Sequence, residues 1–226
     1  MTQYHLPGNP PVPLALRRSG RARRISLRVS QLDGRVTLTV PKGVADREAL
    51  EFAESKADWI RGHLAKHPGI EVLGYGSQLP IEGDMRTVVP IAGRRVVLSE
   101  TTVGVPGQEP GIRLQAFLKQ AARDRLAGAS DRYAARLGAT YSRITLRDTR
   151  SRWGSCSSQG ALMYSWRLIL APPEVLDYVA AHEVAHLSEM NHSAAFWAKL
   201  ESLYGDYRPA RDWLRREGGA LHRFQF

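Results

Sequence analysis

Alternating hydrophobic and polar residues predict a β-hairpin over residues 25–40. Hydrophobic side chains occupy every second position on both sides of a central Asp33-Gly34 pair, a dipeptide that favours a tight two-residue turn. The alternating residues are Ile25, Leu27, Val29, Val36, Leu38 and Val40. A second hairpin is expected over residues 88–98, around Ala92-Gly93.

Helical spacing of apolar residues appears next. Residues from Asp46 to about Lys66 predict one helix, and residues 112–137 predict a second, longer helix. The rest of the chain is expected to form shorter elements. These are strands at 144–146 and 161–166, a turn or strand start at 152–157, a helix at 174–189 and further helical pieces at the end.

Composition along the chain suggests three segments. Residues 1–20 are rich in proline and are expected to form a loose tail. Residues 101–111 contain two prolines and three glycines, which makes them the expected domain boundary. We therefore predict a β-rich region with one long helix over residues 21–108 and a second domain over residues 109–226.

The pentapeptide His182-Glu183-Val184-Ala185-His186 carries the most specific chemistry in the chain. Two histidines four residues apart lie one turn apart on one face of a helix, so they can hold a single metal ion. Glu183 lies between them and can act as a base on metal-activated water. Pro172 and Pro173 suit the start of this helix. The pattern predicts a metal-dependent hydrolase, with Zn²⁺ as the expected metal.

A catalytic zinc ion usually has three protein ligands, so a third ligand is required. His192 is the first candidate, but on a continued helix it would lie about 240° away from His186. The chain must therefore turn between them, and Asn191 suits a left-handed turn position. Ser193 can then cap a following helix over about residues 194–204. Asp206 and Glu201 are the rival ligands.

The composition is that of a soluble globular protein with a basic excess. The net charge is +10, from 32 Lys and Arg against 22 Asp and Glu. Arginines cluster at residues 17–28 and 208–216, and such clusters can attract nucleic acid. No apolar run has the length of a membrane span, and the single cysteine excludes an internal disulfide. We expect a cytoplasmic protein that does not associate with a membrane.

Short motifs flank the pentapeptide on both sides. They are Arg152-Trp153-Gly154-Ser155-Cys156-Ser157, Trp166-Arg167-Leu168, Ala171-Pro172-Pro173-Glu174-Val175-Leu176-Asp177-Tyr178, Asn191-His192-Ser193, Phe196-Trp197, Asp206-Tyr207-Arg208 and Trp213. Residues 23–29, Val40-Pro41 and Trp59-Ile60 add to the set. Together these motifs resemble the YgjP-like metallopeptidase domain family, which has relatives among the SprT-like proteases.

The resemblance implies an α+β fold. A β-rich N-terminal part would be followed by a zincin-like helical catalytic domain with a small antiparallel sheet, over residues 109–226. It also implies zinc at His182, His186 and His192, catalysis by Glu183, and a protein or peptide substrate. The SprT-like relatives suggest action on proteins bound to DNA, which the basic clusters would permit.

Other roles and functions stay open at this stage. Tyr207, Arg208 and Arg152 are candidates to contact the transition state or the substrate. Cys156 is expected to be a small buried residue, and the remaining histidines (His5, His63, His67 and His222) are expected at the surface.

The alternative functions are a metal-dependent hydrolase of a nucleotide or other phosphate substrate and a nucleic-acid-binding protein with a structural metal. Nickel, cobalt or manganese could also occupy a site built from imidazoles. The sequence does not define an oligomeric state.

Overall fold

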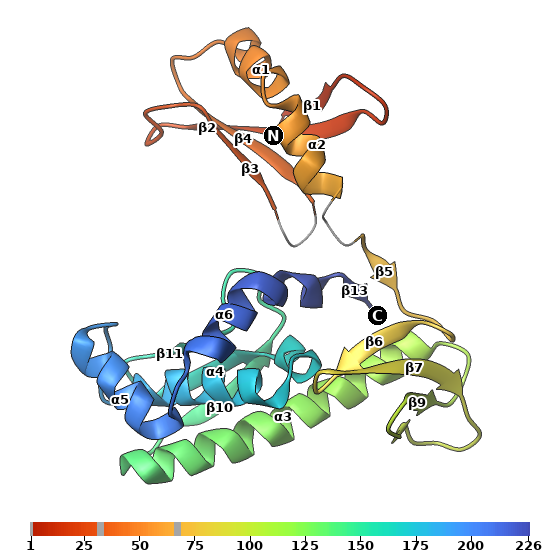
Figure 1. Cartoon of the computed structure of the whole chain (residues 1–226), viewed down its shortest axis with the longest axis vertical. Helices are drawn as coiled ribbons and strands as arrows, with labels where there is room; N and C mark the ends of the chain where they lie inside the picture. The colour runs from red at the N-terminus through yellow and green to blue at the C-terminus, as the bar shows by residue number, and fades with distance from the viewer. Residues whose placement is uncertain (1, 31–33, 66–68) are drawn as a thin grey trace. The chain divides into compact units, whose positions relative to one another are not determined.

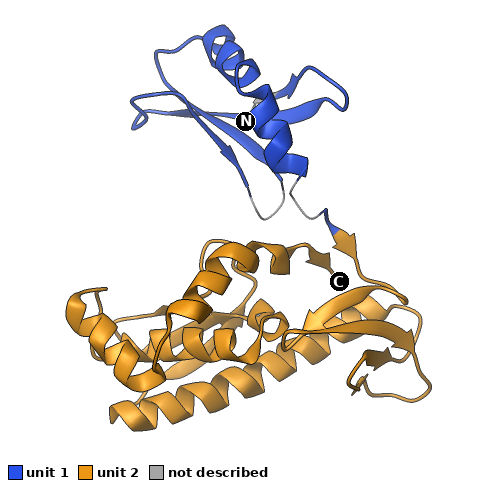
Figure 2. Ribbon diagram, viewed as in Figure 1, with its two compact units in different colours: residues 1–70 blue, residues 71–226 orange. Residues whose placement is uncertain are grey.

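The computed structural model describes residues 2–30, 34–65 and 69–226. The chain forms two compact units, residues 1–70 and residues 71–226 (Figure 2). The boundary expected at residues 101–111 falls inside the second unit, because Val103 and Val105 are fully buried in the core of that unit. The β-rich region expected over residues 21–108 is therefore divided between the two units.

The first unit is a four-stranded sheet with two helices (Figure 1). The strand order is β1-β2-β4-β3, and β2 pairs with β4 in parallel. The strands are β1 (Thr2–Leu6), β2 (Val12–Ser19), β3 (Ser26–Val29) and β4 (Val36–Pro41). Antiparallel pairing of β3 with β4 confirms the first predicted hairpin, although Asp33 of its turn lies outside the described residues.

The expected N-terminal tail is wrong, because residues 2–19 supply two of the four strands. Val12, Leu14 and Leu16 alternate with exposed or half-buried residues and belong to the hydrophobic core of the first unit. The prolines had indicated a loop. The hydrophobic alternation prevails because burying each of these side chains contributes about 1.5–3 kcal/mol.

The helix predicted over residues 46–66 is two helices, α1 (Asp46–Glu54) and α2 (Ala57–Ala65). The first ends where the Ser55 hydroxyl donates a 2.8 Å hydrogen bond to the Phe52 carbonyl. Ala53 and Ile60 remain buried in the same core, so the break preserves the apolar face that the periodicity predicts. Lys66 lies outside the described residues.

The second unit contains a sheet with the order β6-β7-β9-β8. Its strands are β6 (Gln78–Ile81), β7 (Asp84–Pro90), β8 (Val97–Leu98) and β9 (Thr102–Val105). The hairpin expected at residues 88–98 is wrong: β7 pairs antiparallel with β6 and parallel with β9. The turn between β6 and β7 is at Glu82-Gly83, and both residues have positive φ.

A smaller sheet in the same unit has the order β10-β12-β11. Its strands are β10 (Arg143–Arg147), β11 (Gly154–Cys156) and β12 (Ala161–Ser165). It is antiparallel between β11 and β12 but parallel between β10 and β12, so the expected antiparallel sheet is a mixed one. A two-stranded parallel pair joins β5 (Glu71–Val72) to β13 (Phe224–Gln225) near the C-terminus.

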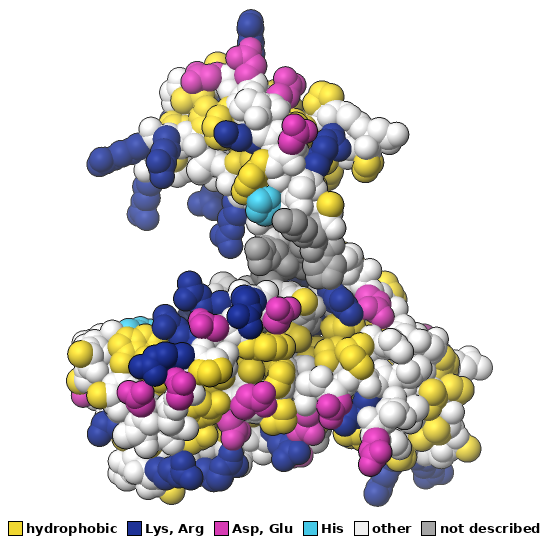
Figure 3. Space-filling model, in the orientation of Figure 1, with side chains coloured by type: hydrophobic (Ala, Val, Ile, Leu, Met, Phe, Trp, Pro, Cys, Tyr) yellow, Lys and Arg dark blue, Asp and Glu magenta, His cyan; other side chains and the backbone are white. Residues whose placement is uncertain are grey.

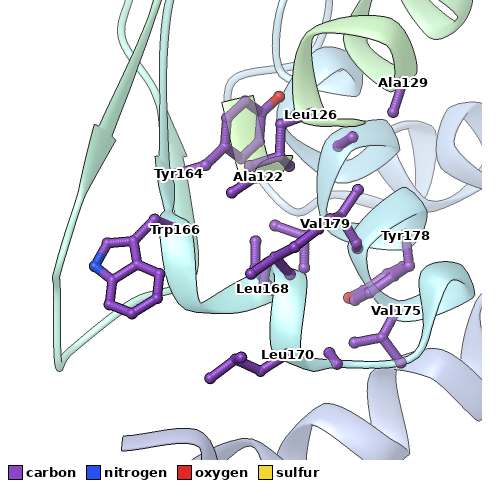
Figure 4. Packing of buried hydrophobic residues seen from close by; sticks show 14 of the residues in the cluster. Ala122, Leu126, Ala129, Tyr164, Trp166, Leu168, Leu170, Val175, Tyr178 and Val179 are labelled. Carbon is purple, nitrogen blue, oxygen red and sulfur yellow. The ribbon is translucent and has the colours of Figure 1, made fainter. Parts of the chain in front are cut away.

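The predicted long helix is confirmed as α3 (Pro110–Leu137), and α4 (Pro173–Ala185) packs along it (Figure 1). The 3-10 turn η1 (Trp166–Leu170) leads from β12 towards α4. Buried side chains from all these elements interlock in the core of the second unit (Figure 4). Nine of the thirteen residues of α4 are buried, so this helix is held from several sides.

The chain closes with α5 (Ala194–Tyr204), α6 (Arg208–Glu217) and the 3-10 turn η2 (Gly218–His222). Buried Arg167 ties this end to the sheet region. Its guanidinium donates to the Asp148 carboxylate at 2.6 and 3.1 Å and to the carbonyls of Leu221 and Phe224, each at 3.0 Å. No described helix is long and apolar enough to cross a membrane.

His222 is buried, so its expected surface position is wrong. Its ring centroid lies 5.1 Å from that of Trp153, and the side chain is 9% exposed. Burial, and then the nearby positive charge of Arg167, lowers the pKa of His222 to about 4. The folded protein therefore resists protonation of this ring, whereas the unfolded chain accepts a proton near pH 6.5.

A His222→Gln variant should be less sensitive to acid than the wild type. As the pH falls from 7 to 4, the unfolded wild type gains the proton first, so the wild type loses stability that the variant does not lose. The wild type should lose about 2–3 kcal/mol more than the variant over this range, by the size of the pKa shift. Urea denaturation of both proteins across the range measures the difference. A pH-independent difference would contradict the assignment.

Candidate metal centre

The pentapeptide lies at the C-terminal end of α4. Pro173 occupies the first turn, as the sequence indicates, but the helix ends at Ala185 rather than near Glu189. His186 is the C-cap residue, with φ −65° and ψ −15°. His182 and His186 are therefore still one turn apart, and the chain leaves the helix immediately after the second histidine.

The turn that the sequence requires before His192 is present, but Asn191 does not adopt the expected left-handed conformation. Among the described non-glycine residues, only Glu82 has a positive φ. The Asn191 side-chain oxygen instead accepts a 3.1 Å hydrogen bond from the Ser193 amide. Ser193 then caps α5 by accepting a hydrogen bond from the Phe196 amide, which confirms the predicted cap.

Three imidazoles converge at this turn. His182, His186 and His192 can each offer one ring nitrogen, and these nitrogens lie within 4.8 Å of one another. The Nε2 atoms of His182 and His192 are 3.0 Å apart. Within the described part of the chain, these three residues form the one group of at least three His, Cys, Asp or Glu side chains with metal-binding geometry.

The surroundings keep these imidazoles suited to metal binding. Burial, and then the neighbouring histidines, lowers the pKa of His182 to about 3, and burial also lowers the pKa of His192. Neutral imidazole is the form that binds metal ions. His186 lies with its Nδ1 atom 2.8 Å from the Glu189 carbonyl, so Nδ1–H donates there and Nε2 faces the cluster as an acceptor.

The Phe196 ring packs against all three histidine rings. This fully buried ring lies 4.9 Å from His182, 4.4 Å from His186 and 4.8 Å from His192, between ring centroids. Trp197 is partly buried and lies 5.6 Å from His192. Phe196 is thus a core residue that restricts the orientations of all three imidazoles.

Glu183 lies on the buried side of the same helix and is 5% exposed. Burial raises the pKa of its carboxyl group to about 8, and the positive charge of Arg152 opposes this shift. Gly154 on β11 makes room for the side chain. A Cβ atom at position 154 would lie 2.5 Å from Glu183 Oε1 and 2.6 Å from its Cγ.

The two rival ligands lie apart from the cluster. Asp206 and Glu201 are exposed and both form ion pairs with Arg208, at 3.0 and 3.4 Å. Arg208 is thereby engaged with these carboxylates, which weakens its candidacy as a substrate contact. Tyr207 is buried, and its ring stacks on Trp197 with a centroid distance of 5.1 Å.

Arg211 is the residue near the cluster that the sequence did not single out. Its guanidinium carbon lies 4.8 Å from the centre of the Trp197 ring. Its positive charge contributes, after burial and the histidines themselves, to the low pKa values of His182 and His192. In the described part of the chain its side chain has no ion-pair partner. Arg211 lies about one turn after Arg208 on α6, so the sequence spacing could have indicated that it shares a helix face with Arg208.

Cys156 packs against the core but is half-buried rather than fully buried as expected. Burial, and then the negative charge of Glu183, raises the pKa of its thiol to about 11. The thiol is therefore protonated near neutral pH, which does not suit a nucleophile or a metal ligand.

The two arginine clusters are separate features. The cluster at residues 17–28 belongs to the first unit, where Arg18 forms an ion pair with Asp46, and the cluster at residues 208–216 lies on α6. On the face drawn in Figure 3, Lys and Arg side chains form several groups with acidic and hydrophobic side chains between them. The clusters alone do not identify a nucleic-acid partner.

Comparison with known proteins defines the class. Residues 23–217 match a metallopeptidase domain, so the protein is a metal-dependent hydrolase that acts on proteins or peptides. The chain belongs to the YgjP-like metallopeptidase family. Among solved structures, it resembles the metallopeptidase zymogen of Pyrococcus abyssi abylysin at 23% identity, with a TM-score of 0.36 and coverage of 46% of this chain and 99% of that chain. No curated protein matches the chain.

A Gly154→Ala substitution should displace the Glu183 side chain while leaving His182, His186 and His192 in place. We expect hydrolysis of an unfolded protein such as casein to fall at least tenfold, with metal content unchanged. Gly128→Ala on α3 is the matched control, because the nearest atom to a Cβ there is 4.0 Å away. Equal activity of both variants would show that the Gly154 contact does not position Glu183.

Proposed function

We propose that the protein is a zinc-dependent metallopeptidase in which His182, His186 and His192 hold the metal and Glu183 is the general base. The convergence of three imidazole nitrogens within 4.8 Å, at the end of α4 and in the turn that follows it, is the observation that supports this most strongly. The match to a metallopeptidase family supports the same reaction.

The donor set fits zinc. Zinc accepts imidazole nitrogen, and three protein ligands with an open fourth position are typical of catalytic rather than structural zinc sites. When bound, zinc polarises the substrate carbonyl and lowers the pKa of water to about 7. Nickel, cobalt and manganese also bind imidazole nitrogen, so metal analysis of the purified protein distinguishes them from zinc.

Glu183 supplies the proton transfers in this proposal. Its carboxylate accepts a proton from the attacking water at one Oε atom and later donates that proton to the nitrogen of the departing amine. Burial raises the pKa of this carboxyl group, which makes its carboxylate a stronger base than an exposed one.

Arg211 is the side chain that we place nearest the developing negative charge on the substrate carbonyl. It is held against Trp197, beside His182 and His192, and it is free of ion pairs among the described residues. Arg208 is paired with two carboxylates, and Tyr207 is stacked in an aromatic layer. Arg152 lies near Glu183 and is better placed to act on that carboxyl group.

The two alternative functions have less support. A hydrolase of phosphate substrates would share the metal chemistry, but the family match is to peptidases. A nucleic-acid-binding protein with a structural metal would be expected to have four protein ligands. The described residues bring together three.

A Glu183→Gln variant should lose peptide hydrolysis and keep its metal. Removal of the general base is expected to lower the rate by about 10²–10⁴-fold, since the amide cannot accept the proton. Casein hydrolysis and zinc content are measured together. Glu201→Gln, on an exposed position of α5, is the isosteric control and should retain activity. Full activity of Glu183→Gln would refute its role.

A His192→Ala variant should lose bound zinc, because two imidazoles and water hold the ion more weakly than three imidazoles. Zinc per chain after dialysis against a chelator is the measurement, and circular dichroism checks the fold. Asp206→Asn serves as the control for the rival ligand and should keep zinc. Retention of zinc by His192→Ala with loss from Asp206→Asn would reverse the assignment.

An Arg211→Met variant should bind zinc normally but turn over substrate more slowly. Loss of one group that stabilises an oxyanion lowers kcat by about 10²–10³-fold in well-studied cases. The effect should appear in kcat rather than in KM. Arg215→Met, an exposed change on the same helix, provides the control. An unchanged kcat would show that Arg211 only packs on Trp197.

A further inference from the structure

A groove crosses the outer face of the sheet formed by β10, β12 and β11. Its volume is about 550 Å³. The register places Thr145, Met163 and Ser155 side by side across the three strands, and all three line the groove. Alternate strand positions such as Ile144, Leu146 and Tyr164 pack against the core instead.

The groove has a strongly cationic lining. Arg143, Arg147 and Arg152 line it together with five serine and threonine residues, and neither Asp nor Glu is among its lining residues. Within the described ranges, the side chains of Arg143 and Arg147 have no hydrogen-bond or ion-pair partner. The Thr145 and Thr149 hydroxyls already donate to backbone carbonyls, at 3.3 and 2.8 Å. An anionic ligand would therefore meet the unpaired guanidinium groups and the serine hydroxyls of the lining.

The groove and the Glu183 side chain lie on opposite faces of β11 and both lie near Arg152. β11 lines the groove with Ser155, while Gly154 on the same strand contacts Glu183 from the core side. Arg152 also belongs to both regions, because it lines the groove and its charge acts on Glu183. A polypeptide with its scissile bond at the histidines could thus continue onto this sheet face.

We propose that this groove binds an acidic segment of the protein substrate and gives the peptidase a preference for Asp and Glu on one side of the cleaved bond. The proposal rests on the peptidase function above. Strands are spaced by about 4.8 Å, so the two intervals from β11 to β10 span roughly three residues of extended peptide. The preferred carboxylates should therefore lie within about three residues of each other.

An acidic peptide fits this lining better than a nucleic acid does. Proteins that bind single strands stack bases on aromatic side chains, and no aromatic residue is among those that line the groove. Serine hydroxyls donate equally well to carboxylates. Because β11 also borders the Glu183 side chain, a substrate bound for hydrolysis would bring a peptide chain to this strand.

Quenched fluorescent peptides test the preference. All peptides contain the same cleavable core. Each carries three Glu, three Gln or three Lys residues either before the core or after it. We expect kcat/KM for one Glu-flanked peptide to exceed that of its Gln counterpart at least fivefold, and the advantage to shrink in 0.5 M salt. The Arg143→Gln/Arg147→Gln double variant should reduce the ratio to less than twofold.

The control is the double variant Arg94→Gln/Arg95→Gln, which removes the same charge from an exposed loop of the same unit and should keep the preference. Equal cleavage of all flanks, or a preference that survives Arg143→Gln/Arg147→Gln, would refute the groove assignment and leave the peptidase function intact.

A binding measurement separates the two proposals if no peptide is cleaved. Fluorescence anisotropy of the labelled Glu-flanked peptide should then show binding that the Arg143→Gln/Arg147→Gln variant loses, which would support the groove without the peptidase. Absence of binding would refute it. A single-stranded oligonucleotide of equal charge should compete weakly; tighter binding of the oligonucleotide through the same arginines would overturn the acidic-peptide assignment.

Discussion

The burial of α4 is the constraint on which the rest of the second unit depends. This helix packs against α3, the small sheet and α5, and residues on nearly all of its faces are inaccessible to water. A helix held in this way cannot rotate without exposing apolar surface, so the directions of His182, Glu183 and His186 are fixed by packing. The histidines emerge at the end of the helix because it stops at Ala185, where the chain turns towards α5.

Two separate parts of the chain determine the geometry of the candidate site. Residues 182–196 carry the three imidazoles and the Phe196 ring beneath them, so the geometry of the cluster is largely local. The space for Glu183 comes from β11, about thirty residues earlier, through the missing side chain of Gly154. The position of the proposed base therefore depends on tertiary packing, whereas the positions of the three histidines depend mainly on one helix end and one capped turn.

This division explains how much the sequence could predict. The spacing of the pentapeptide, the need for a turn before His192 and the Ser193 cap are local patterns, and the structure brings these residues together as they indicate. Strand partners depend on contacts between residues far apart in the sequence. β7 pairs with β6 and β9, and not with residues 97–98 as predicted, because pairing depends on which side chains the whole unit buries. The prolines in residues 2–19 favoured a loop over the two strands that form there. The burial of His222 leaves no periodic signal in the sequence.

The aromatic layer beside the cluster has an optical consequence. Tyr178, Tyr207 and Trp197 stack in sequence, and Arg211 lies over the last ring. Indole emission responds to the charge and polarity around the ring, and Trp197 lies 5.6 Å from His192 and 6.1 Å from His182. Trp197, one of five tryptophans in the chain, is thus an intrinsic fluorophore beside the histidine cluster, and its share of the emission should change with the charge at that cluster.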